Sequence, residues 1–103
     1  IKPPYIAVIF TSLKTESTEG YGEMNDIAWD EAKKLDGFIK MESARDTDGL
    51  GISISYWKNM EAVNIWRNNP IHRQAKQKGI NDWYTYYNIR ICEVKDEKEF
   101  NKK

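Results

Sequence analysis

Two spacings of apolar residues alternate along this chain. In some segments β-branched and aromatic residues follow one another in short runs, which is typical of strands. In others they recur every three or four positions, which is typical of amphipathic helices. These patterns predict strands over residues 5–12, 38–45, 50–57 and 84–94, helices over 20–35 and from 59 onward, and a further helical segment over 70–79. Trp29 lies about a third of a turn off the apolar stripe of the first helix. That stripe consists of Tyr21, Met24, Ile27, Ala28, Ala32 and Leu35.

Several of these boundaries coincide with residues that suit the ends of helices. Gly37 follows the first helix and suits a left-handed cap, and residues 46–49 form a turn between two strands. Asn59 can cap the second helix. Asn69 suits an N-cap and Pro70 suits the first helical position, so we expect the further segment to begin there.

The resulting order of elements is β-α-β-β-α-β, which predicts an α+β fold of the ferredoxin-like type. Right-handed crossovers place both helices on one face of a single antiparallel sheet. We assign residues 1–95 to one domain and residues 96–103 to a charged tail, which we expect to fray.

The first and last strands are apolar on both of their faces, although the two predicted helices cover only one. On the first strand the two sets are Ile6, Val8 and Phe10 on one face and Tyr5, Ala7 and Ile9 on the other. On the last strand they are Tyr87, Ile89 and Ile91, and Tyr84, Tyr86 and Cys92. A sheet with one wet face alternates apolar and polar residues. We therefore expect a second copy of the chain to cover the free face, giving a homodimer.

Composition narrows the classes of partner. The 103 residues include 16 Lys plus Arg and 16 Asp plus Glu, so the formal net charge is zero. A neutral chain has no electrostatic reason to bind nucleic acid or an acidic membrane surface. No apolar run approaches the ~20 residues of a membrane span, and residues 1–4 do not resemble a signal peptide. Cys92 is the only cysteine, so no disulfide can form within the chain. We expect a cytoplasmic protein.

His72 and Trp66 are the first candidates for a functional site. His72 is the only histidine and sits near the start of the segment after Pro70, where a helix N-terminus favours a neutral imidazole that can act as a base. The alternative is a partly exposed surface histidine. Trp66 lies on the apolar stripe of the second helix, as core or as the wall of a pocket. No second His or Cys lies at ligand spacing, so we expect no metal.

An aromatic cluster, Trp83-Tyr84 with Tyr86-Tyr87, opens the last strand. Because side chains alternate along a strand, Tyr86 and Tyr87 cannot share a face, and at most half of the cluster lines one cavity. Arg90 falls on the face of Tyr86, where Glu42 is one possible ion-pair partner. The glycines form no phosphate-binding pattern, so a nucleotide cofactor is disfavoured.

Taken together, these residues resemble the antibiotic-biosynthesis-monooxygenase domain, a family of dimeric α+β barrels. The likeness runs from about residue 5 to residue 95. The matching pieces are YIAVIFTS over 5–12, Gly37-Phe38 with MESAR over 41–45, GISISYW over 51–57, Glu61-Ala62 leading to Trp66, His72, and Trp83-Tyr84 through Tyr87 and Arg90.

The resemblance implies a homodimer with a cavity between helices and sheet in each protomer. Known members oxidise small aromatic or polyketide-like molecules with dioxygen, without metal or flavin. A related branch degrades heme and looks to carry an Asn on the first strand, a Trp on the second helix and a heme-ligating His. Here Trp66 matches the Trp, but Lys76 stands where the His would align and the first strand has no Asn, so heme degradation is the less expected activity.

Two hypotheses follow. The first is a cofactor-independent monooxygenase with His72 as the base and with Trp66, Tyr87, Tyr86 and Trp83 as substrate-binding candidates. The second is a non-catalytic dimer, either small-molecule-binding or stress-related, that reuses the fold. A roomy apolar cavity with converging polar groups favours the enzyme, and a cavity filled by Trp66 and Trp83 favours the binding protein.

Overall fold

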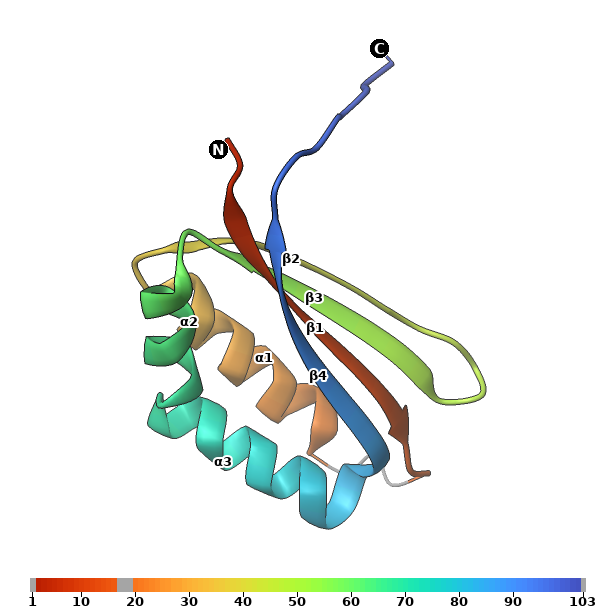
Figure 1. Ribbon diagram of the computed structural model, residues 1–103. Coiled ribbons are helices and arrows are strands. Elements are labelled where there is room, and N and C mark those ends of the chain that lie inside the picture. Colours follow the sequence, from red (N-terminus) through yellow and green to blue (C-terminus); the bar gives the residue numbers. More distant parts are fainter. Residues whose placement is uncertain (1, 17–19, 103) are drawn as a thin grey trace.

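The computed structural model describes residues 2–16 and 20–102 of the chain. Figure 1 shows a sheet with the helices gathered along one side of it. The elements are β1 (Tyr5–Lys14), α1 (Tyr21–Lys33), β2 (Phe38–Arg45), β3 (Leu50–Trp57), α2 (Met60–Arg67), α3 (Pro70–Lys78), the π-helical turn η1 (Gly79–Trp83) and β4 (Tyr84–Val94).

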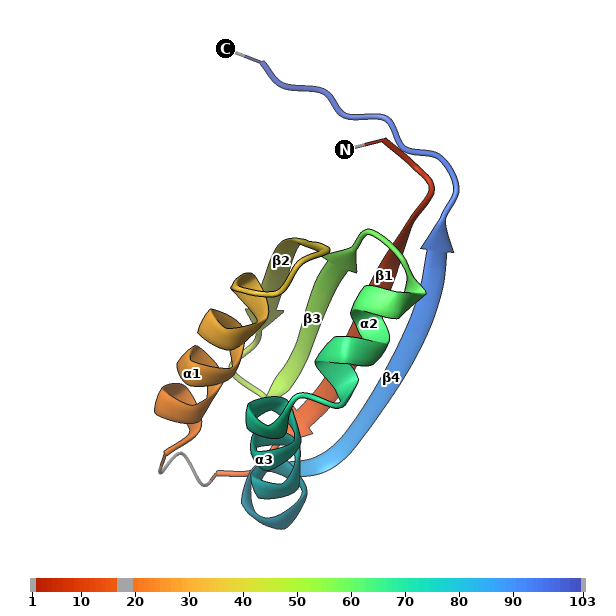
Figure 2. The same cartoon turned by 90° about the vertical axis from the view of Figure 1, so that its left-hand side faces the viewer.

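The four strands form one antiparallel sheet in the order β2-β3-β1-β4. All the helices lie on the same face of this sheet, as the turned view in Figure 2 makes plain. The predicted ferredoxin-like α+β fold is confirmed. The new helical segment predicted from Pro70 is the separate helix α3. The helical layer therefore has three helices where the predicted order counted two, and the π-helical turn η1 after α3 was not predicted.

Asparagine caps explain why α2 and α3 are separate. The Asn59 side chain accepts a hydrogen bond from the backbone N–H of Ala62, at 2.9 Å, and starts α2. The Asn69 side chain accepts from the N–H groups of Ile71 and His72, at 2.9 and 3.2 Å, and starts α3 with Pro70 at its first position. Each cap satisfies backbone donors that the helix itself leaves unpaired.

The hydrophobic core lies between the helices and the middle of the sheet. Trp57 of β3 is fully buried and packs against α2 through Val63 and Trp66. The remaining buried members of this core are Ile6, Ala28, Ala32 and Ala62. Small residues on α1 and α2 allow these helices to approach the large indoles closely.

The inward face of α1 differs from the predicted stripe. Ile27, expected to face the sheet, is 50% exposed and lies beside α3, whereas Trp29 packs against the core. The stripe that does face the sheet is Tyr21, Asn25, Ala28, Trp29 and Ala32. Both sets of residues follow helical spacing. The set with Trp29 faces the sheet because burying an indole removes more apolar surface from water than burying the Ile27 side chain.

A β-bulge at the start of β4 changes the faces of its tyrosines. Ser12 pairs with Tyr87 and Leu13 with Tyr86, but Lys14 pairs with Tyr84, so Thr85 is an extra residue in the ladder. Strict alternation placed Tyr84 on the face of Tyr86. The bulge instead turns Tyr84 to the helix side, together with Tyr87, because one inserted residue reverses the parity of the strand beyond it.

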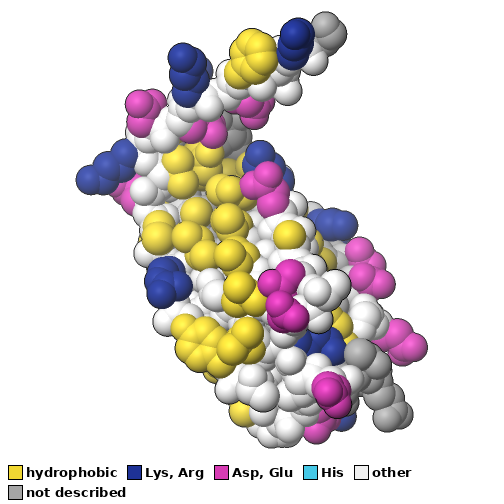
Figure 3. All heavy atoms as spheres, turned by 90° about the vertical axis from the view of Figure 1, so that its right-hand side faces the viewer, with side chains coloured by type: hydrophobic (Ala, Val, Ile, Leu, Met, Phe, Trp, Pro, Cys, Tyr) yellow, Lys and Arg dark blue, Asp and Glu magenta, His cyan; other side chains and the backbone are white. Residues whose placement is uncertain are grey.

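The other face of the sheet carries no helix, and Figure 3 shows apolar side chains gathered in a band on this side of the molecule. The strand register assigns twelve apolar residues to it: Tyr5, Ala7, Ile9, Leu13, Ala44, Leu50, Ile52, Ile54, Tyr56, Tyr86, Cys92 and Val94. Of these, Leu13, Leu50, Ile52 and Tyr86 are between 39% and 47% exposed. We call this set the free face.

Arg90 and Glu42 both lie on the free face, but they cannot pair within one protomer. The register places Arg90 opposite Ile9, Ile9 opposite Ile54, and Ile54 opposite Glu42. Two strands therefore separate the arginine from the carboxylate, which amounts to roughly 14 Å at normal strand spacing. The pairing considered from the sequence is wrong, because it ignored the strand order.

Beyond β4 the chain continues without regular structure, although one contact ties it down. The hydroxyl of Tyr5 donates to a carboxylate oxygen of Glu97 at 2.7 Å. Among the described residues, no helix combines the length and the apolar character that a membrane crossing requires.

Two glycines provide a test of the packing of α2. Gly37 has φ +95°, and a Cβ there would meet the Cβ of Ala62 at 2.5 Å, whereas a Cβ at Gly22 in α1 would meet nothing within 4 Å. We expect Gly37→Ala to lower the free energy of unfolding by about 2–4 kcal/mol, from left-handed strain and overpacking. Gly22→Ala should raise it by about 0.5–1 kcal/mol. Urea unfolding measures both, and equal effects would contradict this account of Gly37.

Candidate functional site

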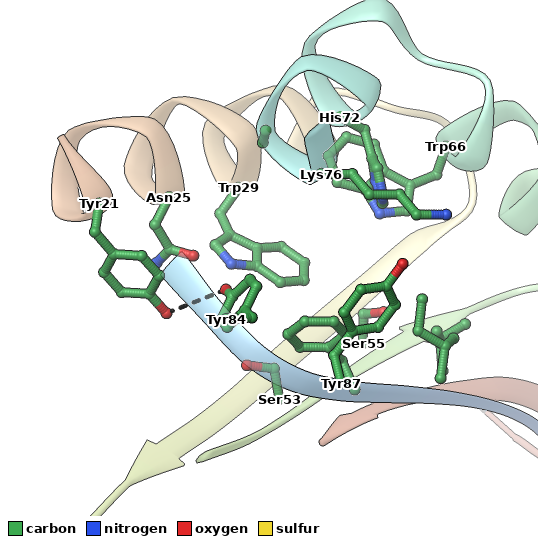
Figure 4. Close-up of a pocket in the computed structure, with 14 residues that line it drawn as sticks. Tyr21, Asn25, Trp29, Ser53, Ser55, Trp66, His72, Lys76, Tyr84 and Tyr87 are labelled. Carbon is green, nitrogen blue, oxygen red and sulfur yellow. Dashed lines mark hydrogen bonds between the residues drawn. The ribbon is translucent and has the colours of Figure 1, made fainter. Parts of the chain in front are cut away.

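A cavity of about 150 Å³ lies between the helices and the sheet. Figure 4 shows it with Tyr21, Asn25 and Tyr84 at one end, His72, Lys76 and Trp66 at the other, and Trp29 between. The remaining lining residues are Val8, Phe10, Ser53, Ser55, Ala75, Tyr87 and Ile89. The walls are mostly apolar with a few polar groups, which is the usual character of a small-molecule site.

Three indoles stack along one side of the cavity, and two of them, Trp29 and Trp66, line it. Trp57 and Trp66 have ring centroids 6.0 Å apart with planes 24° from parallel, and Trp66 and Trp29 have centroids 6.1 Å apart at 29°. The indole N–H of buried Trp57 donates to the Ser55 hydroxyl at 2.9 Å, so its polar atom is satisfied. The stack joins β3, α2 and α1 and fixes the shape of the cavity.

His72 is placed against this wall by the start of α3. The Asn69 cap orients the first turn of the helix, and the imidazole meets the Trp66 ring edge-on, with centroids 4.2 Å apart. Its Nδ1 atom is buried and has no hydrogen-bond partner among the residues that the structure describes. Burial, aided by the positive charge of Lys76, lowers the pKa of His72 to about 4. The ring is therefore neutral near pH 7 and can accept a proton or a hydrogen bond.

The floor of the cavity consists of aromatic residues from β1 and β4. Phe10 lies between Tyr84 and Tyr87, with ring centroids 5.4 and 5.6 Å away. The Tyr84 hydroxyl donates to that of Tyr21 at 3.5 Å, and burial raises the pKa of Tyr84. Within the described residues no Asp or Glu lines the cavity, and no group of three or more His, Cys, Asp or Glu could hold a metal ion.

Comparison with known proteins identifies the family. The family model described as antibiotic biosynthesis monooxygenase matches residues 4–78, which is most of the chain and includes Trp66 and His72. The chain belongs to the antibiotic biosynthesis monooxygenase family. This confirms the resemblance drawn from the sequence.

Similar proteins extend the comparison without supplying an activity for this chain. The uncharacterized protein YqjZ of Bacillus subtilis is 43% identical over 99 residues, covering 96% of this chain and 87% of that protein. Two solved structures share the fold at TM-score 0.79 and cover 92% of this chain. They are SnoaB, a cofactor-independent oxygenase from Streptomyces nogalater (8% identity, 97% of that chain), and Rv0793 from Mycobacterium tuberculosis (12% identity, 99% of that chain).

Three of the five predicted site residues line the cavity, and two do not. Trp66, His72 and Tyr87 are brought together as expected from the sequence. Tyr86 lies on the free face, 47% exposed, because it alternates with Tyr87. Trp83 is buried in η1, edge-on to Tyr21 with centroids 5.3 Å apart, and lies outside the cavity lining.

The α1 side of the cavity was not predicted from the sequence. Tyr21, Asn25 and Trp29 recur at four-residue spacing, which puts them on one face of a helix. That spacing is visible in the sequence, but a polar residue in its middle hid it among the apolar positions. Tyr84 was missed because no sequence signal marked the bulge at Thr85.

The neutral, buried state of His72 predicts a pH-dependent stability. Its pKa is about 4 in the folded protein against 6.5 as the ordinary value, so below pH ~6.5 the unfolded chain binds the proton more readily. The contribution is fully present above pH ~6.5 and is lost as pH falls toward 4, by up to roughly 3 kcal/mol.

Urea unfolding at a series of pH values measures this effect. His72→Gln should flatten the decline between pH ~6.5 and ~4 relative to the native protein, because the variant has no imidazole to protonate. Identical pH profiles for the two proteins would show that His72 titrates normally and is not buried.

Proposed function

We propose that the protein is a cofactor-independent monooxygenase that oxidises a small aromatic molecule with dioxygen in this cavity. The observation that carries the proposal is the imidazole of His72, neutral and with an unpartnered nitrogen, at the edge of a cavity walled by aromatic rings. The family and the cofactor-independent oxygenase among the structural neighbours support it. The specific reaction is our inference from the site.

The size of the cavity favours a single ring over a polyketide-like molecule. About 150 Å³ is the volume of an engineered cavity that holds benzene. Trp66 forms part of the wall and leaves this space open, and Trp83 does not reach it. A monocyclic phenol fits, whereas several fused rings require the walls to move apart.

The chemistry follows from an electron-rich ring in a dry site. A deprotonated phenol transfers one electron to dioxygen, and the resulting radical and superoxide combine to form a C–O bond at a ring carbon. His72 takes the proton from that carbon as the O–O bond breaks. One oxygen atom stays on the ring as a quinone carbonyl and the other leaves as water, so phenol and dioxygen give quinone and water. Preorganised donors and exclusion of water are the contributions of the protein.

A second candidate function is binding without catalysis. The low pKa of His72 favours it, because an imidazole whose pKa is about 4 is a weak base near pH 7. The enzyme hypothesis requires a bound ligand to raise this pKa, and an anionic ligand anywhere in the cavity acts in that direction. Heme degradation receives less support, since Lys76 lines the cavity where the heme-ligating His would align.

We further propose that the free face is covered by a second copy of the chain, in the cytoplasm. Twelve apolar residues share this sheet face, and a contiguous exposed apolar patch of this kind marks an interaction site. Arg90 and Glu42 at opposite edges of this face supply charges that a two-fold partner could pair. The lone thiol of Cys92 is consistent with a reducing compartment.

Catalysis is tested by dioxygen uptake with a panel of monocyclic phenols. His72→Ala should lower turnover by roughly 10²–10⁴-fold, the usual contribution of a general base. Arg73→Ala, at an exposed position on the same helix, is the matched control and should leave turnover unchanged. Equal turnover in the native protein and His72→Ala would remove His72 from the mechanism and favour the binding protein.

Sedimentation velocity at micromolar concentration tests the dimer. The native protein should sediment as a dimer with an interface above ~1,200 Å², and Ile52→Glu on the free face should shift it to the monomer. Ile65→Glu changes an equally exposed isoleucine on α2 (50%, against 44% for Ile52) and should leave the dimer intact. A native monomer, or dissociation by Ile65→Glu alone, would contradict the proposal.

A further inference from the structure

The end of the cavity farther from His72 has a polar arrangement that the proposed reaction leaves unexplained. The hydroxyls of Tyr21 and Tyr84 meet there at 3.5 Å (Figure 4). Outside the lining, Nη2 of Arg45 on β2 donates to the Tyr21 hydroxyl, also at 3.5 Å. The guanidinium carbon of Arg45 is 6.0 Å from the centroid of each tyrosine ring. Two phenols and a cation therefore converge at one point of an otherwise apolar cavity.

The charge of Arg45 is held in place by neutral groups only. Its Nη2 donates to the Ser12 hydroxyl at 2.7 Å, and its Nη1 donates to the carbonyl oxygens of Ser12 and Gly49. Gly51 leaves the room in which the guanidinium sits, since a Cβ there would collide with it. Within the described chain no carboxylate pairs with Arg45. A half-buried guanidinium without a counter-charge attracts an anion.

The hydrogen bonds at Tyr21 leave one donor available to a ligand. Its hydroxyl oxygen accepts from Tyr84 and from Nη2 of Arg45, each at 3.5 Å. A tyrosine hydroxyl has two acceptor sites and one proton. With both acceptor sites turned to Arg45 and Tyr84, its proton has no acceptor among the described residues, and the Arg45 charge polarises it.

The charges around the cavity also favour an anionic ligand. The ionisable residues that line it are Tyr21, Tyr84 and Tyr87, with His72 and Lys76 from α3. Carboxylates are absent from the described lining, where Lys76 is the charged side chain.

We propose that Tyr21, Tyr84 and Arg45 bind the ionised oxygen of the ligand, so that the ligand class is a monocyclic aromatic oxyanion. The oxygen accepts the proton of Tyr21, with Arg45 behind it and Asn25 at the same end of the cavity. The opposite edge of the ring then faces Trp66 and His72. The inference rests on the proposed binding of an aromatic ring in this cavity and assigns its orientation.

Para-nitrophenol and para-nitroanisole are suitable probes, because they share a ring but only the first ionises. At a pH where free para-nitrophenol is half ionised, adding the native protein should shift its absorbance toward the phenolate. The phenolate should bind about 10- to 100-fold more tightly than the anisole, which is the range of one hydrogen bond to a charged group. Benzoate competing equally well would extend the class from phenolates to carboxylates, and both are oxyanions.

Tyr21→Phe is the decisive variant, since it removes one hydroxyl and keeps the ring that packs against Trp83. It should weaken phenolate binding at least about 10-fold and leave anisole binding unchanged. Arg45→Gln should have the same effect on binding, and circular dichroism checks that this variant folds. Arg67→Gln, at an exposed position on α2, is the matched control and should bind both probes as the native protein does.

Three results would overturn the assignment: equal binding of the two probes by the native protein, equal loss of both in Tyr21→Phe, or binding of neither. These results are distinct from failure of the proposed function. Tight phenolate binding with no dioxygen uptake from any phenol would remove the enzyme and leave the oxyanion site standing. Turnover with equal affinity for both probes would do the reverse.

Discussion

The stack of Trp57, Trp66 and Trp29 is the packing interaction on which the rest of the molecule depends. Trp57 is fully buried at the end of β3, where it anchors the indole of α2, and Trp66 in turn anchors the indole of α1. Large rings bury more apolar area than any aliphatic residue and hold helices away from the sheet by their own width. The space that remains beyond Trp29 and Trp66 is the cavity, so the same two indoles pack against the core and line the site.

The break between α2 and α3 puts the only histidine against this wall. A continuous helix through residues 68 and 69 would carry His72 along the axis of α2, whereas the Asn69 cap starts a new direction and brings the imidazole onto the edge of Trp66. The buried Nδ1 of His72 makes no hydrogen bond to any described residue. Leaving such an atom unpaired costs about 1–3 kcal/mol, a cost that a purely structural residue has no reason to carry.

The sequence was sufficient where a local rule had one outcome. The bounds of β2, β3 and β4 follow from their turns, and the two asparagine caps follow from Asn59 and Asn69-Pro70. It was insufficient where two patterns competed. Ile27 and Trp29 both fit a helical stripe, and only packing against Trp66 decides between them. The Thr85 bulge, the strand order that separates Arg90 from Glu42, and the placing of Arg45 behind Tyr21 all depend on contacts distant in sequence.

The most direct test of the account is to locate a bound aromatic ring by intermolecular nuclear Overhauser effects, with phenol as the probe. If the ring binds in the cavity between helices and sheet, phenol protons should contact the ring of His72 and the indoles of Trp66 and Trp29, which line that cavity. Contacts to Ile52 and Tyr86 of the free face, with none to these three residues, would contradict it.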